Sequence, residues 1–149
     1  MTVTAHVFPQ FQLGLAQKLQ SLGADTIMAA LSNAAGPVGL ATTGVQAAKL
    51  WTDWKTNVAA EITGTGYTAG GVALTGVTST VTGNVWTLNA TSPSWATSTI
   101  TANQIIFYDT TAGTEQLIAF ADFGGAVSST ASTWTYTINA SGIVTATAS

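Results

Sequence analysis

The chain has 149 residues and a formal net charge of −3, and only 6% of its residues are Asp, Glu, Lys or Arg, against about 25% in typical globular domains. It contains no cysteine, which excludes disulfides, cysteine-ligated zinc and thiol nucleophiles. It also contains no arginine, and because nucleic-acid sites rely on Lys and Arg to contact phosphates and guanine, we expect no nucleic-acid partner.

The few charges are unevenly distributed along the sequence. The three basic residues all lie in the first 56 positions, whereas four acidic residues and no basic ones follow from residue 57 onward. A surface so poor in charge must be covered by Thr, Ser, Asn, Gly and Ala, which repel neighbouring copies only weakly. Such a surface suits a protein that packs against other proteins, although a compositional habit of the source organism accounts for it equally well.

The sequence carries no membrane or secretion signal. No apolar run approaches the ~20 residues of a membrane-spanning helix, and the first residues lack the basic start and apolar core of a signal peptide. We therefore expect no membrane partner, and we expect the protein to be made in the cytoplasm and kept there until any assembly step.

The first 60 residues contain a short extended segment and then a helical pattern. Residues 2–8 alternate weakly between apolar and polar side chains, which predicts a short strand or an extended arm. From Pro9 to Gly23 the spacing becomes helical, and these two residues stand where a helix begins and ends. The apolar stripe of this predicted helix consists of Phe11, Leu15, Leu19 and Leu22.

Two further segments of this part carry helical signals. By propensity Asp25–Ser32 favours a helix capped by its first residue, although its apolar run also fits a buried strand. Val45–Val58 repeats apolar residues at spacings of three and four, which predicts a second short helix. Trp51 and Trp54 on one face of that helix are either a core anchor or a contact with a partner subunit.

The glycine-rich stretch Glu61–Gly76 separates this part from the rest of the chain. Its glycines allow positive φ angles or close strand packing, Tyr67 is the one large side chain among them, and Val72 to Gly76 alternates like a half-buried strand. The dinucleotide motif G-x-G-x-x-G is incomplete because Ala69 takes the place of its last glycine, and G-K-[ST] is absent. The stretch therefore predicts the start of a β region rather than a phosphate site.

After this stretch the pattern predicts strands. Gly83-Asn84 is a turn or bulge signal within Val77–Leu88. Thr99–Asp109 holds the most continuous apolar run, which predicts a central strand. Gln116–Phe123 predicts another strand, closed by Gly124-Gly125.

The end of the chain completes the predicted fold. Thr133–Ile138 and Ile143–Ala148 flank a four-residue loop and predict a terminal hairpin. The fold class that follows is mainly β with one or two helices near the N-terminus (α+β), arranged as an antiparallel β-sandwich or barrel. We expect a single domain over residues 1–149, with a helix-containing part (1–60) and a β-rich part (61–149).

No arrangement of residues in the sequence predicts catalysis. His6 is the only histidine and lies near the N-terminus, so we expect no triad, histidine metal site or positioned histidine base. Asp109, Glu115 and Asp122 cluster around one predicted turn and strand, but their spacing matches no calcium loop. We interpret Asp109 as a turn cap and the other two as solvated, and we expect no catalytic residue, metal or cofactor.

Several blocks after residue 60 form a recognisable pattern, which consists of Gly64–Gly76, Trp95, Ser98–Thr110, Leu117–Gly124 and Thr135–Val144. Over roughly residues 61 to 148 this pattern resembles a family of small structural proteins of tailed-bacteriophage particles. The resemblance implies a helix followed by a strand in the N-terminal part, and hence a strand at Asp25–Leu31. The chain carries less charge than the family pattern after the glycine-rich stretch, and Trp51–Lys55 has no counterpart in it.

The resemblance implies a non-enzymatic virion protein that decorates or cements the capsid. The implied partners are the major capsid protein and further copies of this chain, and the implied location is the capsid surface. An alternative is a tail or fibre component, including a receptor- or carbohydrate-binding module; a third is a hydrolase that uses Asp109 and Glu115. The residues we select as partner contacts, which we expect to be exposed aromatics, are Trp51, Trp54 and Trp95, together with Tyr67.

Overall fold

The computed structural model describes residues 3–17, 21–111 and 115–148. In chain order its elements are β1 (Thr4–Val7), α1 (Pro9–Ala16), β2 (Ile27–Ser32), α2 (Trp51–Asn57), β3 (Val72–Ala73), β4 (Thr78–Thr82), β5 (Val85–Asn89), β6 (Ser94–Asp109), β7 (Gln116–Thr135) and β8 (Val144–Thr147). One antiparallel sheet has the order β1-β7-β6-β2-β3 and a second has the order β4-β5-β8. The predicted fold class, mainly β with two N-terminal helices in a sandwich-like arrangement, is confirmed.

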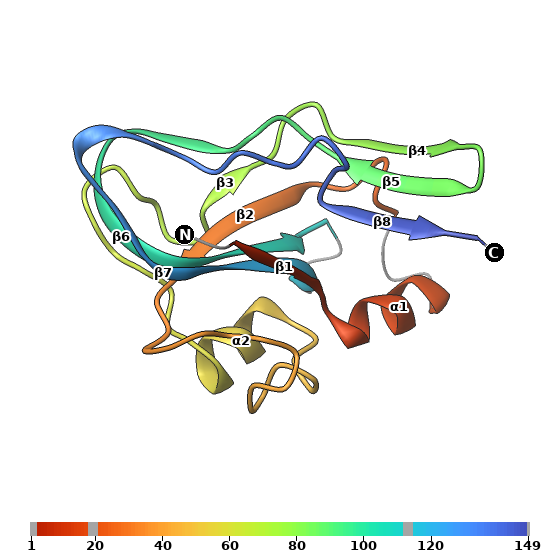
Figure 1. Cartoon of the computed structure of the whole chain (residues 1–149), viewed down its shortest axis with the longest axis horizontal. Coiled ribbons are helices and arrows are strands. Elements are labelled where there is room, and N and C mark those ends of the chain that lie inside the picture. Colours follow the sequence, from red (N-terminus) through yellow and green to blue (C-terminus); the bar gives the residue numbers. More distant parts are fainter. Residues whose placement is uncertain (1–2, 18–20, 112–114, 149) are drawn as a thin grey trace.

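The long β6–β7 hairpin holds the two layers together. It pairs with β1 and β2 in the lower layer of Figure 1 and then curves upward toward the layer that contains β4 and β5. The rings of Phe123 and Trp134, both on β7, lie 5.7 Å apart between centroids. An extended strand would separate residues eleven positions apart by about 36 Å, so β7 must bend sharply between them. The prediction of a central strand at Thr99–Asp109 is confirmed, because β6 lies between β7 and β2.

A bulge in β7 lies at the glycine pair that the sequence predicts as the end of this strand. Gln104 pairs with Asp122 whereas Ala102 pairs with Val127, so residues 123–126 stand opposite a single residue of β6. Gly124 adopts a φ of 71° there, and such a bulge bends a strand without ending it. The prediction that Gly124-Gly125 closes this strand is therefore wrong, since β7 continues to Thr135.

The segment that was ambiguous between helix and strand is a strand. β2 pairs with β6 in antiparallel register, with Ala30 opposite Ile106, and with β3 on its other side. The strand implied by the resemblance is thus found from Ile27 onward, and the helix favoured by propensity is not formed. Pairing on both edges and burial of Leu31 and its neighbours outweigh the small helical preference of Ala and Met.

The glycine-rich stretch runs along the outer edge of β2. The amide of Ile62 donates to the carbonyl of Leu31 at 3.1 Å, and the amide of Leu74 donates to Ile27 at 2.8 Å. At Gly71 the φ is 79°, and an added Cβ would lie 1.9 Å from the carbonyl oxygen of Ala29, so only glycine fits this approach. The strand predicted from Val72 to Gly76 is present but shorter, because β3 ends at Ala73.

Both helices are shorter than their apolar patterns predicted. α1 begins at Pro9 as expected but ends at Ala16, and the predicted stripe residue Leu19 lies outside the described residues. α2 begins only at Trp51. Residues 49–51 instead extend beside β7, where the amide of Trp51 donates to the carbonyl of Glu115 at 2.9 Å. The carboxylate of Asp53 then accepts the amides of residues 49 and 50, which fixes the start of α2.

The second sheet contains one predicted hairpin and lacks another. β4 and β5 are joined at Gly83-Asn84, as the turn signal predicted. The prediction of a terminal hairpin is wrong, because its two segments pair with other strands. Trp134 pairs with Trp95 of β6, and β8 pairs with β5. The amide of Ile143 donates to the carbonyl of Leu88 at 2.8 Å, so the last segment crosses to another strand.

The two faces of the large sheet are covered by different elements. In Figure 1 the helices lie beneath this sheet, β4 and β5 lie above it, and β8 extends to the right beside it. Beneath, the ring of Trp54 contacts Phe8 at 5.7 Å and Phe120 at 5.1 Å. Above, the ring of Phe107 contacts that of Tyr136 at 5.9 Å. The core therefore has two compartments, with the large sheet between them.

Candidate functional site

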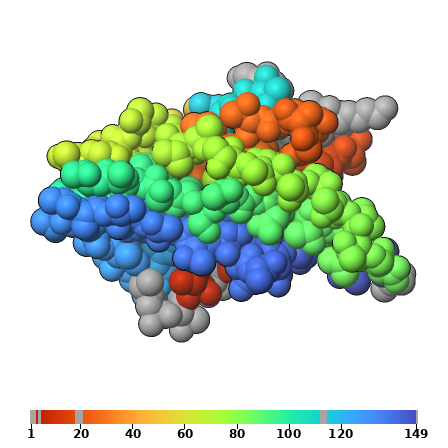
Figure 2. Space-filling model, turned by 90° about the horizontal axis from the view of Figure 1, so that it is seen from above, coloured from red at the N-terminus to blue at the C-terminus, as the bar shows by residue number. Residues whose placement is uncertain are grey.

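Charged residues are confined to two stretches of the chain. Every Asp, Glu, Lys and Arg lies within residues 18–61 or 109–122, so residues 62–108 and 123–149 contain none. The uncharged stretches supply β3 to β5, the whole of β6 except Asp109, the distal half of β7, and β8. Figure 2 shows the side of the molecule that they form, with the N-terminal residues only at its rim. The side chains of these two stretches carry no charge, and their polar groups are hydroxyls, amides and indole N–H groups.

The outer face of the three-stranded sheet is an array of threonines, which we call the threonine face. Thr80 pairs with Thr87, which pairs in turn with Thr145. Cross-strand partners point to the same side of a sheet, so these three side chains form a row. The full set of threonines is Thr78, Thr80 and Thr82 on β4, Thr87 on β5, and Thr145 and Thr147 on β8, and the same register places Val85 and Asn89 of β5 on this face. On the opposite side Leu88 and Val144 are buried, whereas Ser79 and Val81 of β4 are exposed.

The threonine face ends at an open strand edge. All five residues of β4 are exposed, and Val81 retains 69% of its accessible surface. In the described parts of the chain, β5 is the only strand that pairs with β4. Natural sheets protect such edges with charges, proline or bulges, and residues 78–82 have no proline or charge.

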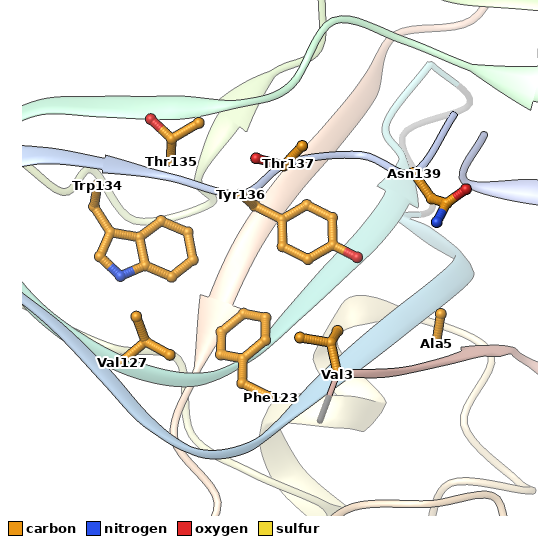
Figure 3. Close-up of a pocket in the computed structure, with 9 residues that line it drawn as sticks. All are labelled: Val3, Ala5, Phe123, Val127, Trp134, Thr135, Tyr136, Thr137 and Asn139. Atoms are coloured by element: carbon orange, nitrogen blue, oxygen red, sulfur yellow. The ribbon is translucent and has the colours of Figure 1, made fainter. Parts of the chain in front are cut away.

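A separate cleft lies between the layers beside β1. It has a volume of about 420 Å³, and Figure 3 shows Phe123 and Val127 on one wall facing Trp134 and Tyr136 on the other. Burial raises the pKa of Tyr136 above its ordinary value. The complete lining is Val3, Ala5, Phe123, Val127, Trp134, Thr135, Tyr136, Thr137 and Asn139, none of which is charged. This composition fits an uncharged ligand with an apolar surface.

The two tryptophans of α2 are core residues. Trp51 is 1% exposed and stacks on Tyr108 with ring centroids 5.5 Å apart. Trp54 is fully buried and donates its indole N–H to the hydroxyl of Ser32 at 3.1 Å. Of the two alternatives, the core anchor is confirmed, and the expected exposure is wrong, because helical spacing places both on the face that α2 turns toward the sheet.

The other two selected aromatics are also held inside the fold. Trp95 is 3% exposed and contacts the ring of Trp134 at 5.4 Å, so its predicted exposure is wrong as well. Tyr67 is half-buried: its hydroxyl donates to Glu61 at 2.8 Å and accepts the amide of Leu31 at 3.0 Å. Burial, followed by the nearby Glu61 carboxylate, raises the pKa of Tyr67 despite the opposing effect of the Leu31 hydrogen bond. Tyr67 therefore fastens the glycine-rich stretch to β2.

His6 occupies a defined position. It lies in β1 opposite Phe120, and their ring centroids are 4.9 Å apart. The short strand predicted within residues 2–8 is confirmed, since β1 pairs along its whole length with β7.

The candidate carboxylates are not assembled into one site. Asp109 stands opposite Gln116 on the β6–β7 ladder, whereas Asp122 stands opposite Gln104. Oδ1 of Asp109 accepts the amide of Thr111 at 2.8 Å, which confirms its predicted turn-capping role. Because the capping carboxyl is buried and lies beside that of Asp25, its pKa rises to about 6 even though the Thr111 amide opposes the shift.

Asp122 is buried and hydrogen-bonded, so its predicted solvation is wrong. Its Oδ2 accepts the amide of Val38 at 2.8 Å and the side-chain amide of Gln104 at 2.9 Å. Its Oδ1 accepts the amide of Gly124 at the bulge, at 2.8 Å. The oxygen of the Gln104 side chain accepts the amide of Ala34 at 3.0 Å. This network binds the loop before α2 to the large sheet, which is a structural role.

Sequence reasoning missed two of these features. The threonine face had a signal in the sequence, the segment Thr78-Ser-Thr-Val-Thr82. In a strand every second residue points to the same side, so its three threonines share one face. The pairing of Asp25 with Asp109 left no local signal, since it depends on the register of β2 against β6.

The described residues contain no group of three or more His, Cys, Asp or Glu side chains that could hold a metal ion. None of the described helices is long and apolar enough to cross a bilayer. Comparison of the chain with protein-family models, curated proteins and solved structures found no match.

Proposed function

We propose that this chain is a non-enzymatic structural protein of a tailed-bacteriophage particle that decorates and stabilises the capsid shell. The observation that carries the proposal is the uncharged side of the molecule, with the threonine face and the open β4 edge on it. The sequence resemblance supplies the bacteriophage context. In this proposal the partners are the major capsid protein and neighbouring copies, and the location is the outer capsid surface after synthesis in the host cytoplasm.

The physical argument rests on what a contact with a protein lattice requires. Transferring a charged side chain from water into an interface is unfavourable unless a partner charge is supplied. Threonine hydroxyls and methyl groups can be covered without that requirement, because a hydroxyl needs only one hydrogen-bond partner. Copies that lie side by side on a shell also avoid like-charge repulsion if the surfaces between them are neutral.

The proposal is tested on virus particles with and without the chain. Particles that lack it should assemble and then release DNA at lower temperature, or on transfer to low salt, than complete particles. Adding back the purified chain should restore resistance. Particles of unchanged robustness would contradict a cementing role.

A matched pair of variants locates the contact. Thr145→Glu adds a charge to the threonine face, and Thr52→Glu adds the same charge to an exposed residue in the first turn of α2, where helices tolerate acids. The first variant should fail to bind particles and the second should bind as the parent does. Equal binding of both would show that the threonine face is not the contact.

The aromatic cleft of Figure 3 favours one second candidate, a sugar-binding module on a tail or fibre. Aromatic walls with hydroxyl and amide groups nearby suit the apolar face of a neutral sugar. A glycan array would detect this activity, and Tyr136→Ala should abolish it while particle binding through the threonine face persists.

A further inference from the structure

The hydrogen bonds of β5 show which main-chain amides and carbonyls of β4 point outward. The carbonyl of Leu88 accepts the amide of Ile143, so the backbone of Leu88 faces β8. In an antiparallel ladder successive residues face opposite sides, so Thr87 faces β4 and its partner Thr80 faces back toward it. The amides and carbonyls of Ser79 and Val81 therefore point away from β5. No described residue forms a main-chain hydrogen bond with them.

The edges of β1, β3 and β8 are shorter or less accessible than that of β4. β3 has two residues. The outer side of β8 borders a groove walled by Ala5, His6 and Val7 of β1. β1 itself is followed by α1 after one residue, with Pro9 at the first position of that helix. β4 thus offers an incoming strand five exposed residues, more than β1, β3 or β8 contains.

We propose that β4 pairs antiparallel with β4 of a second copy of this chain, about a two-fold axis that passes beside Thr80. In this register Ser79 of each copy lies opposite Val81 of the other. The two copies then exchange four main-chain hydrogen bonds, and the two β4-β5-β8 sheets become one six-stranded sheet. This inference goes beyond the capsid role and does not depend on it.

The charge pattern favours a second copy as the occupant. A strand that meets its own copy across a two-fold axis brings identical side chains together, so a single Lys or Glu near the axis would face a like charge. β4, its turn and β5 contain no charged residue. The cross-strand neighbours would be Thr80 with Thr80 and Thr78 with Thr82, and β-branched pairs of this kind favour sheet formation. Because the edge is short, we expect reversible pairing that strengthens when copies are held close together.

The absence of cysteine allows a direct test. Thr80→Cys places two thiols opposite each other at the axis, where the Cα atoms of a non-hydrogen-bonded pair lie about 4.5 Å apart, within disulfide range. Thr78→Cys is the matched control: it has the same strand and exposure, but its two copies would lie about 13 Å apart, beyond that range. Under mild oxidation the first variant should form covalent dimers at least about tenfold faster than the second. Equal rates for the two variants would overturn the proposal, as would faster dimerisation of Thr145→Cys.

A second measurement uses the protein without a disulfide. Val81→Pro removes one outward amide while leaving the β4–β5 ladder intact, because that amide faces away from β5. Sedimentation of the parent at rising concentration should show a monomer–dimer equilibrium that this variant lacks, with both melting at similar temperatures. A parent that stays monomeric at millimolar concentration would overturn self-pairing even if the chain binds particles, and a variant that still dimerises would overturn the β4 edge as its site.

Discussion

The helix-bearing side and the threonine face differ in what their polar groups contact. Beneath the large sheet, Asp122, Gln104 and Ser32 are buried and hydrogen-bond to one another or to loop amides. On the threonine face the hydroxyls are mostly exposed to water, and charges are absent. Polar groups of the first kind specify the fold, whereas those of the second kind remain available to a partner. Substitutions should therefore alter stability on one side and binding on the other.

The largest effect on stability is expected at Trp54. Replacing it with alanine removes contacts with Phe8 and Phe120 and leaves the hydroxyl of Ser32 without its indole donor. Trp54→Ala should lower the free energy of unfolding by about 3–5 kcal/mol, measured by urea denaturation. Thr145→Ala, on the threonine face, should change it by less than about 0.5 kcal/mol. Similar losses for both would abolish the distinction between the two regions.

The next largest effect is expected at the close approach of the glycine-rich stretch to β2. Gly71→Ala places a Cβ 1.9 Å from the carbonyl oxygen of Ala29 in a backbone with φ of 79°. It should lower the free energy of unfolding by more than about 2 kcal/mol. Gly125→Ala is the control, because a Cβ there has no atom within 4 Å and its φ is not positive. If thermal melting showed equal losses, the fit of the stretch against β2 would not require glycine.

A smaller, pH-dependent effect is expected at Asp109. Because its pKa is about 6 in the folded chain and 3.8 in the reference state, the native protein holds the extra proton between these values. Binding of this proton stabilises the folded state at pH 4. The free energy of unfolding should therefore fall by about 2 kcal/mol as the pH rises to 7 and the proton is lost.

Asp109→Asn retains the oxygen that accepts from Thr111 and has no charge to repel Asp25. The advantage of the variant over the parent should therefore grow by about 2 kcal/mol between pH 4 and pH 7. Chemical denaturation across this range measures it. A difference independent of pH would show that Asp109 is not held protonated by its surroundings.

The smallest effect on stability is expected on the threonine face itself. Thr145→Glu should change the free energy of unfolding by less than about 0.5 kcal/mol, because the residue is exposed on β8. The same variant should lose particle binding. A variant that unfolds easily would show that this face is part of the folding core.

Local patterns predicted the features that local physics determines. Pro9 at the start of α1, the Gly83-Asn84 turn and the central apolar strand β6 all follow from one stretch of sequence. The failures depend on distant partners. Gly124 lies within a strand because Asp122 accepts its amide at the bulge, and Ile27–Ser32 is a strand because β6 pairs with it.

The candidate site was harder to predict than the fold. Composition indicated an uncharged contact surface, but it could not place that surface, because the uncharged stretches converge only through the bend of β7. Aromatic residues were selected as contacts because tryptophan is enriched in interfaces. The three selected tryptophans, Trp51, Trp54 and Trp95, are buried instead, since a large side chain at helical or strand spacing fills the core as readily.

A cryo-electron microscopy map of virus particles that contain this chain would test the central claim most directly. We predict that the chain lies on the outer capsid surface, with the threonine face against the shell or a neighbouring copy and the two helices directed toward solvent. A map in which the helix-bearing side contacts the shell, or in which the chain is absent from the capsid, would contradict the claim.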